Sequence, residues 1–174
     1  MTQLSQLVTI KDHFLGSLDS PATLLEYGDY QCLVCRLAFP IIKQLLKEMN
    51  GKICFVFRHF PLKTSHPLAF EGAKAAESAA LQNRFWEMHN LLYAKQNELH
   101  PSIWPKLAEE LHLDIEKFNT AFHSSLIEEK IQNEFMAGVR SGVNGTPCFY
   151  INGNRFDGDA SYDNLKKVLS DQFL

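Results

Sequence analysis

The sequence of 174 residues has no long apolar run, no cluster of basic residues and no strong excess of charge of either sign. Its formal net charge is −3, which argues against the basic surface that a nucleic-acid-binding protein needs. No apolar stretch reaches the length of a membrane span, so we expect no insertion into a membrane. Apolar residues make up 45% and charged residues 21%, which is usual for one globular domain of this length.

The start of the chain also lacks the features of a secretory signal peptide. Residues 1–16 mix polar and charged residues with short apolar pairs, so neither a basic start nor an uninterrupted apolar segment is present. This pattern predicts a cytoplasmic protein. An exported, periplasmic protein from which a leader had been removed would have the same sequence.

Cysteine is scarce, and the four residues are Cys32, Cys35, Cys54 and Cys148. A domain of this length can bury enough apolar surface to fold without disulfides. The Cys-x-x-Cys spacing of Cys32 and Cys35 indicates redox or metal chemistry, although two small core residues could have it by chance. Zinc would need two more ligands, and the available His59 and His66 form no second paired motif. We therefore predict a redox pair and no metal.

A strand, a helix and a second strand are predicted around this pair. Residues 23–27 have strand character, and apolar pairs then recur every four residues from Leu37 to Met49, where Asn50-Gly51 ends the helix. Residues 52–57 are almost all apolar, which is typical of a strand buried on both faces. This order of elements predicts a βαβ unit.

The middle of the chain, residues 66–141, predicts helices only. Helical patterns cover residues 67–82, 84–96, 102–111, 115–123 and 125–140. Ser102 is the expected N-cap of the third of these helices. Residues 148–151 and 154–156 are expected to form a hairpin around Asn152-Gly153, and Ser161 to cap a last helix that covers the sheet.

The position of Cys32, where a strand gives way to a helix, predicts its chemistry. Unpaired backbone N–H groups and the positive end of the helix dipole favour a thiolate and lower the pKa of a cysteine there. Cys35 lies one helical turn further in, less exposed but close enough to form a disulfide. We therefore assign Cys32 as the attacking nucleophile and Cys35 as the thiol that resolves the mixed disulfide.

The run Glu26-Tyr27-Gly28-Asp29-Tyr30-Gln31-Cys32-Leu33-Val34-Cys35 resembles the active-site segment of the DsbA-like branch of the thioredoxin superfamily. Arg58-His59-Phe60-Pro61-Leu62, Gly145-Thr146-Pro147 and the helical stretch between them are similar to further parts of that family, in the same order. The resemblance implies an α/β thioredoxin fold, in which helices flank a central mixed β-sheet. Residues 1–65 and 142–174 would form the core, and residues 66–141 an inserted all-helical domain.

The resemblance also implies a function and roles for individual residues. A thiol–disulfide oxidoreductase of this kind exchanges disulfides with cysteine-containing protein or peptide substrates, needs a redox partner and uses no bound cofactor. Pro147 would follow a cis peptide bond, and the backbone of Thr146 would pair with an extended substrate. An acid at the position of Glu26 would be buried and would help to move the proton of Cys35. The alternatives are a trans Pro147 that ends a helix and a solvent-exposed Glu26.

Two departures from the family pattern affect these expectations. Leu33-Val34 contains neither the proline nor the histidine that is common between the two cysteines, so Cys32 should be less acidic than in the strongest oxidants. Cys148, after Pro147, is expected to be a small core residue or else a third thiol near the site, and Cys54 to be inert.

Two other functions are compatible with this architecture. One is an enzyme of the glutathione-transferase-kappa or hydroxychromene-isomerase type, against which the second cysteine of the pair, Cys35, argues. The other is a redox-silent peptide-binding or chaperone module, in which Cys32 would be dispensable.

Overall fold

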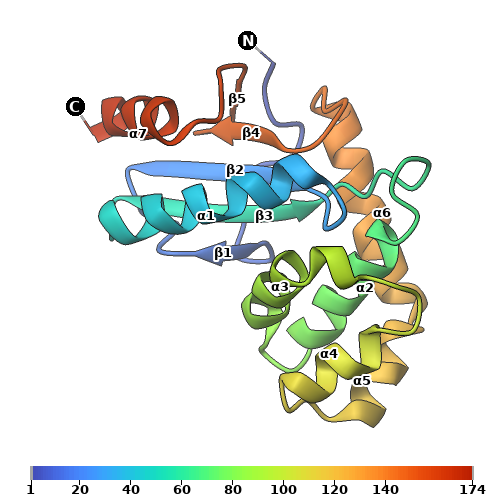
Figure 1. Cartoon of the computed structure of the whole chain (residues 1–174). Coiled ribbons are helices and arrows are strands. Elements are labelled where there is room, and N and C mark those ends of the chain that lie inside the picture. Colours follow the sequence, from blue (N-terminus) through green and yellow to red (C-terminus); the bar gives the residue numbers. More distant parts are fainter. Residues whose placement is uncertain (1, 174) are drawn as a thin grey trace.

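The computed structural model describes residues 2–173 and shows a five-stranded sheet surrounded by helices (Figure 1). The elements are, in chain order, β1 (His13–Leu15), β2 (Ala22–Gly28), α1 (Leu33–Glu48), β3 (Ile53–His59), α2 (Ala69–Ala80), α3 (Phe85–Ala94), η1 (Gln96–Glu98), α4 (Trp104–Glu110), α5 (Ile115–Phe122), α6 (Ser125–Arg140), β4 (Cys148–Ile151), β5 (Asn154–Phe156), α7 (Tyr162–Ser170) and η2 (Asp171–Phe173). The predicted α/β class is confirmed.

The sheet has the strand order β1-β3-β2-β4-β5 and is mixed. The central strands β2 and β3 run parallel, as the predicted βαβ unit requires, and both end at the same edge of the sheet. β4 pairs antiparallel with β2, and β5 completes the predicted hairpin. The edge strand β1, which pairs antiparallel with β3, was not predicted because three residues are too few to show an alternating pattern.

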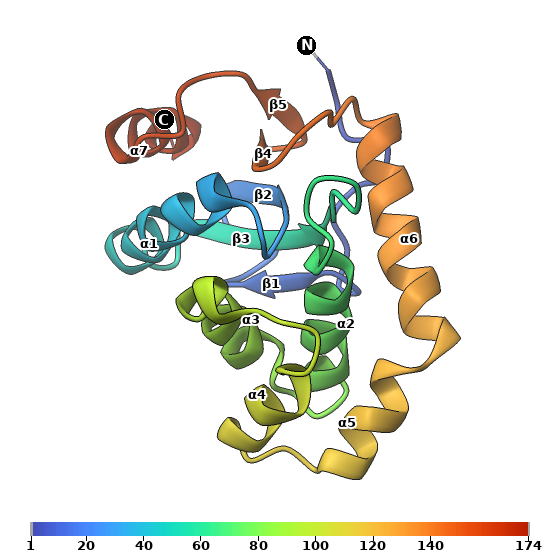
Figure 2. The same ribbon diagram turned by 45° about the vertical axis from the view of Figure 1, so that its right-hand side comes forward.

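Each face of the sheet is covered by different elements. α1, α3 and α7 contribute apolar side chains to the core on one face, and Figure 1 shows α1 in front of β2 and β3. On the other face, Phe135 of α6 and residues of the amino-terminal segment pack against Tyr27, Val56 and Tyr150. α6 runs from the other helices to the side of the sheet where β4 begins (Figure 2). The core therefore lies on both sides of the strand that leads to the cysteine pair.

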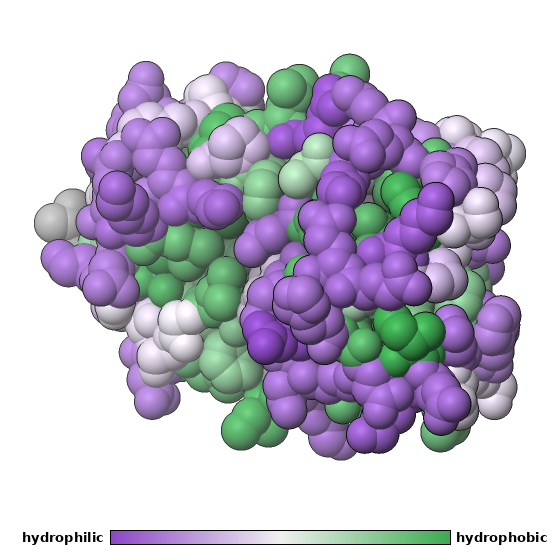
Figure 3. Space-filling model, turned by 60° about the horizontal axis from the view of Figure 1, so that its bottom comes forward, coloured by the Kyte–Doolittle hydropathy of each residue, from purple (hydrophilic) through white to green (hydrophobic). Residues whose placement is uncertain are grey.

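The five helices α2 to α6 fall between β3 and β4, as expected from the sequence. The division of the chain into core and insertion at residues 66 and 141 stays a prediction. Hydrophilic residues cover most of the face seen in Figure 3, with apolar residues in patches between them. Among residues 2–173, no helix combines the length and the apolar character needed to cross a membrane.

Two of the predicted caps differ from the structure. Ser102 does not cap α4, because the helix begins two residues later, at Trp104, and the Ser102 hydroxyl lies 3.2 Å from His100 Nδ1. Ser161 stands at the N-cap position of α7, but its side chain makes no capping hydrogen bond. α5 has a side-chain cap that was not predicted, since the Asp114 carboxylate accepts a hydrogen bond from Lys117 N.

A group of ionisable side chains around the buried Glu77 joins the sheet to the helices. The carboxylate of Glu77 on α2 lies 2.8 Å from His13 Nε2 and 2.9 Å from His59 Nε2, on β1 and β3. Lys130 of α6 contacts the same Glu77 oxygen at 2.5 Å and Glu134 at 3.0 Å. Burial raises the pKa of Glu77, but these partners outweigh burial and hold it well below the usual value. One carboxylate thus links two strands with two helices.

Glu77→Gln is expected to lower the free energy of unfolding by about 3 kcal/mol, the lower end of the cost of breaking a buried ion pair. Because the folded pKa of Glu77 is depressed, its stabilisation is complete above the pKa of an unfolded glutamate, about 4.3, and is lost as the pH falls through the folded value. Urea unfolding at several pH values measures this. Glu87→Gln, which changes an exposed pair with Arg84, is the control and should change stability little.

Candidate active site

Cys32 is the N-cap residue of α1 and lies in the turn that follows β2. It keeps only 6% of its surface exposed, whereas the next residues, Leu33 and Val34, are 54% and 55% exposed. Cys35, one turn into the helix, is fully buried, and both cysteines are free thiols. The predicted arrangement of an outer and an inner thiol is therefore what the structure contains.

The pKa values of the two thiols are shifted in opposite directions. Interaction with the Cys35 thiol lowers the pKa of Cys32 most, burial works against this, and Thr146 and the backbone N–H groups of Val34 and Cys35 lower it further, to about 5. Burial raises the pKa of Cys35 well above its usual value, and the neighbouring Cys32 and Glu26 raise it more. At neutral pH the outer sulfur is a thiolate and the inner one a thiol.

Glu26 lies on β2 with 1% of its surface exposed, among apolar side chains. Burial raises the pKa of its carboxyl group to about 8, although a hydrogen bond with the Cys35 side chain lowers it, and the charge on Cys32 adds to the rise. Its Oε1 atom has no hydrogen-bond partner among the described residues. The structure thus brings a buried, weakly acidic carboxyl group to the inner cysteine, and the alternative of an exposed Glu26 is wrong.

The Thr146–Pro147 loop lies against Cys32. The bond between the two residues is cis, and the Cys32 sulfur lies 3.2 Å from the carbonyl oxygen of Thr146, to which Cys32 donates a hydrogen bond when it is protonated. A hollow of about 370 Å³ adjoins the loop and is lined by residues that include Arg155 and Phe156. All five residues that the sequence pointed to therefore meet at one place, the end of β2 and the start of α1.

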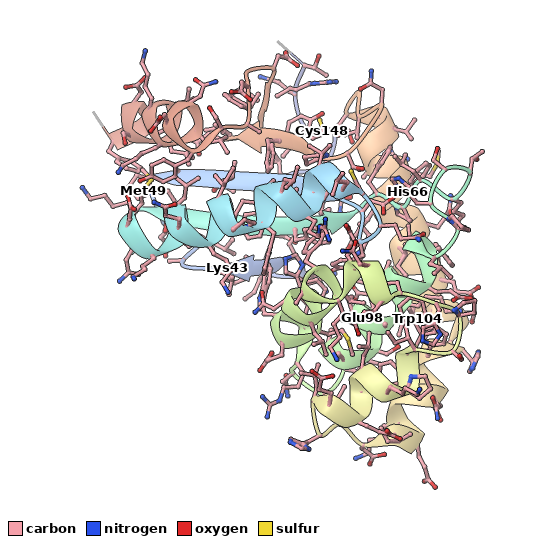
Figure 4. All side chains as sticks on the ribbon, in the orientation of Figure 1. Lys43, Met49, His66, Glu98, Trp104 and Cys148 are labelled. Carbon is pink, nitrogen blue, oxygen red and sulfur yellow. The ribbon has the colours of Figure 1, made fainter. Side chains whose placement is uncertain are left out.

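The remaining cysteines lie on the opposite face of the sheet. Cys54 and Cys148 are both buried in the cluster that contains Tyr27 and Tyr150, and Figure 4 labels Cys148 at β4. Burial raises the pKa of Cys54 to about 11 and that of Cys148 above its usual value. Both therefore have the surroundings of inert core residues.

One residue of the site, Asp29, was not predicted. Its buried carboxylate accepts hydrogen bonds from the backbone N–H groups of Gln31 at 2.7 Å, Cys32 at 3.2 Å and Leu62 at 2.9 Å. It also lies 2.8 Å from Nδ1 of His66, which Figure 4 shows beyond the amino-terminal end of α1. Asp29 lies three residues before Cys32, the N-cap residue of α1, and an aspartate that accepts the N–H two residues further on is typical of a turn, so the signal was present in the sequence.

Two glutamines also reach the turn. The amide of Gln96, at the start of η1, donates to the carbonyl oxygens of Tyr30 and Cys32, each at 2.9 Å. The side-chain oxygen of Gln31 accepts a hydrogen bond from Leu68 N, just before α2. No local pattern could have identified Gln96, because its partners are 64 and 66 residues away in the sequence.

His59 and His66, the two histidines available as zinc ligands in the sequence, have other partners. His59 Nε2 lies 2.9 Å from Glu77, and His66 Nδ1 lies 2.8 Å from Asp29. Among residues 2–173, no group of three or more His, Cys, Asp or Glu side chains is arranged to hold a metal ion.

Sequence comparison finds relatives that are much longer than this chain. The chain is 37% identical over 163 residues to the Na⁺/H⁺ antiporter NhaA 3 of Salinispora tropica, which is 94% of this chain and 25% of the antiporter. It is also 37% identical over 161 residues to NhaA 1 of Mycolicibacterium gilvum, which is 91% of this chain and 26% of that protein. The chain therefore spans about a quarter of the length of the curated relatives that it matches.

This finding corrects one expectation. The cytoplasmic location expected from the lack of a visible leader is wrong. The curated relatives are Na⁺/H⁺ antiporters, and a match to a quarter of such a protein gives a cytoplasmic location no support.

Comparison of structures identifies the fold. BdbD from Bacillus subtilis superposes with a TM-score of 0.84 and 22% identity, covering 99% of this chain and 98% of that one. The thiol-disulfide exchange protein alpha-DsbA2 from Wolbachia pipientis superposes with a TM-score of 0.82 and 23% identity, covering 93% and 87% of the two chains. The family model described as Thioredoxin matches residues 8–171. The chain therefore belongs to the thioredoxin family, and its fold is that of the DsbA-like thiol–disulfide oxidoreductases within the thioredoxin superfamily.

Proposed function

We propose that this domain is a dithiol thiol–disulfide oxidoreductase in which Cys32 attacks and Cys35 resolves. The observation that carries the proposal is the pairing of an acidic thiol, with a pKa of about 5, and a buried thiol of raised pKa one helical turn away. A purely structural cysteine pair would have no reason to contain a thiolate at neutral pH. The substrates would be cysteine-containing proteins or peptides, and a redox partner would return the pair to its starting state.

The first step forms a mixed disulfide. The Cys32 thiolate attacks one sulfur of a substrate disulfide, the substrate S–S bond breaks, and the second substrate sulfur leaves as a thiolate that takes up a proton. The exposed Leu33 and Val34 flank the thiolate without adding charge. Thr146 and Pro147 are proposed to bind the substrate, since the Thr146 carbonyl is already 3.2 Å from the reacting sulfur.

The second step releases the substrate. Cys35 transfers its proton to the Glu26 carboxylate and attacks the Cys32 sulfur, so that the Cys32–Cys35 disulfide forms and the first substrate sulfur leaves as a thiolate. The substrate has then gained two electrons and the cysteine pair has lost two. The same steps in reverse oxidise a dithiol substrate. At neutral pH a carboxyl group with a pKa of about 8 is ionised in a minor fraction of the molecules, and in this fraction Glu26 accepts the proton of Cys35.

Cys32 is expected to be alkylated first of the four thiols, with a rate that is half-maximal near pH 5. The raised pKa values of the other three cysteines make them slow at this pH. Iodoacetamide adducts mapped by mass spectrometry between about pH 4 and 8, a range that spans the pKa of Cys32, measure the order in which the four thiols react. First reaction at Cys54 or Cys148 would contradict the assignment of the nucleophile.

Cys35→Ser is expected to trap mixed disulfides, because attack by Cys32 remains while the resolving thiol is gone. Non-reducing electrophoresis of the variant after incubation with a disulfide-containing peptide measures the covalent complex. Cys148→Ser is the matched control, which removes a buried thiol on the other face of the sheet and should trap nothing. A chaperone-like function without redox chemistry predicts no complex with either variant.

Glu26→Gln is expected to slow turnover at pH 7 by about a hundredfold, the lower end of what general acid–base catalysis contributes, because the amide cannot carry a proton. The variant should be at least as stable as the parent. The carboxyl group is ionised above about pH 4.3 in the unfolded chain but stays protonated up to about pH 8 in the folded one, so the folded state loses stability as the pH rises between those values and does not regain it above them. Turnover against pH, together with urea unfolding, measures both effects. An unchanged pH profile would leave Glu26 without a role in proton transfer.

A further inference from the structure

The helices α2 to α6, with η1 among them, are called the helical region below. A side chain of this region forms hydrogen bonds with the turn that holds the reactive thiol. Gln96 begins η1, directly after α3, and its amide nitrogen donates to the carbonyl oxygens of Tyr30 and Cys32 at 2.9 Å each. Figure 1 shows the carboxyl end of α3 below the amino-terminal end of α1, and Figure 4 labels Glu98 at the end of η1. A glutamine NH₂ group has two hydrogens, so one side chain can satisfy both carbonyls.

These two carbonyls belong to the residues that shape the environment of the thiolate. The Cys32 carbonyl also accepts the N–H of Arg36 at 3.2 Å and so opens the hydrogen-bond ladder of α1. The backbone N–H groups of Val34 and Cys35, in the same turn, lower the pKa of Cys32. Any tilt of the turn changes how these N–H groups face the sulfur.

The turn is held from two directions by different kinds of group. Asp29 binds the N–H groups of Gln31 and Cys32 from within the loop, while Gln96 binds the carbonyls of Tyr30 and Cys32 from the helical region. A carbonyl oxygen near a thiolate is repulsive, and a donor bound to it offsets its negative partial charge. Gln96 therefore acts on the thiolate both through geometry and through charge.

We propose that Gln96 is a positioning residue for Cys32, which sets the acidity of the thiol and the reduction potential of the Cys32–Cys35 pair from the helical region. The inference rests on the proposed function, since it takes Cys32 as the reacting thiol. The hydrogen bonds of Gln96 reach the carbonyl oxygens of the turn, so its action on Cys32 passes through the backbone of the turn. The helical region is thus part of the redox site and not only a cover for the sheet.

Gln96→Met is the first test, because methionine has a similar length and shape but donates no hydrogen bond. The pKa of Cys32 is expected to rise by about half a unit to one unit, so that the thiolate fraction below the pKa falls about three- to tenfold. The potential should become more reducing, because the dithiol form loses stabilisation of its thiolate. Thiolate absorbance against pH and equilibration with glutathione buffers measure the two quantities.

Gln82→Met is the matched control. Gln82 also lies in the helical region and binds backbone, with its amide nitrogen 3.0 Å from Asp114 O and its oxygen 2.9 Å from Asp114 N. This variant should change stability by a similar amount and leave the pKa of Cys32 and the potential unchanged. A change in the pKa of Cys32 that is equal in both variants would overturn the inference, since it would then reflect general loosening.

Gln96→Lys gives a test of opposite sign and serves also if the methionine variant fails to fold. The ammonium group keeps the donors and adds a positive charge, so the pKa of Cys32 should stay the same or fall. A rise in the lysine variant, or a folded methionine variant with the parent pKa and potential, would overturn the role of Gln96. Neither result touches the proposed function, which fails instead if Cys32 of the parent protein is not the most acidic and most reactive thiol.

Discussion

The arrangement of the reactive thiols depends on one buried carboxylate. Asp29 receives the N–H groups of Gln31, Cys32 and Leu62 and pairs with His66, so it fixes the turn before α1 to the segment after β3. A carboxylate without solvent contact is tolerated only when its oxygens are saturated with donors, and here four groups supply them. Because three of these donors are backbone N–H groups, the carboxylate holds the course of the chain rather than one flexible side chain. The position of Cys32 at the start of α1 follows from this constraint.

Once the turn is fixed, two identical thiols become chemically different. Cys32 stands where backbone N–H groups of α1 are open, and its pKa falls to about 5. Cys35 lies one turn deeper, where burial is the first cause of its raised pKa. Burial also keeps Glu26 protonated up to about pH 8. The pair Leu33-Val34 places no cation between the cysteines, so the lowered pKa of Cys32 comes from the Cys35 thiol, Thr146 and the backbone N–H groups at the start of α1.

Local patterns predicted the elements well because short-range periodicity sets them. The apolar spacing from Leu37 to Met49 ends within one residue of α1, and the predicted hairpin around Asn152-Gly153 matches β4 and β5 residue for residue. The spacing of the cysteine pair and its place at a helix start indicated the two thiols, whereas the roles of Glu26, Thr146 and Pro147 were implied by the resemblance of their short motifs to the DsbA-like family. β1 was missed because its only support is a partner strand, β3, about forty residues away in the sequence (His13 faces Phe57).

Long-range polar contacts were the part that sequence reasoning missed. Glu77 is one of twenty acidic residues, and nothing beside it in the sequence reveals that His13, His59 and Lys130 surround it. Gln96 has the same difficulty, because its partners lie in a turn of another part of the chain. A polar side chain shows a local pattern only when its partner is within a turn or two, as with the cap formed by Asp114.

Some of these long-range contacts give the helical region a part in the redox site. The reactive turn is bound near both ends of the α2–α3 segment, by Leu68 N before α2 and by Gln96 after α3. Between these two points, Tyr93 of α3 packs its ring against Tyr30 and Phe39, beside the face of α1 that carries Cys35. Burial is the leading cause of the raised pKa of both Cys35 and Glu26, and α3 contributes to that burial. A helical region that both buries the inner thiol and orients the turn of the outer one therefore controls the difference in acidity on which disulfide exchange would depend.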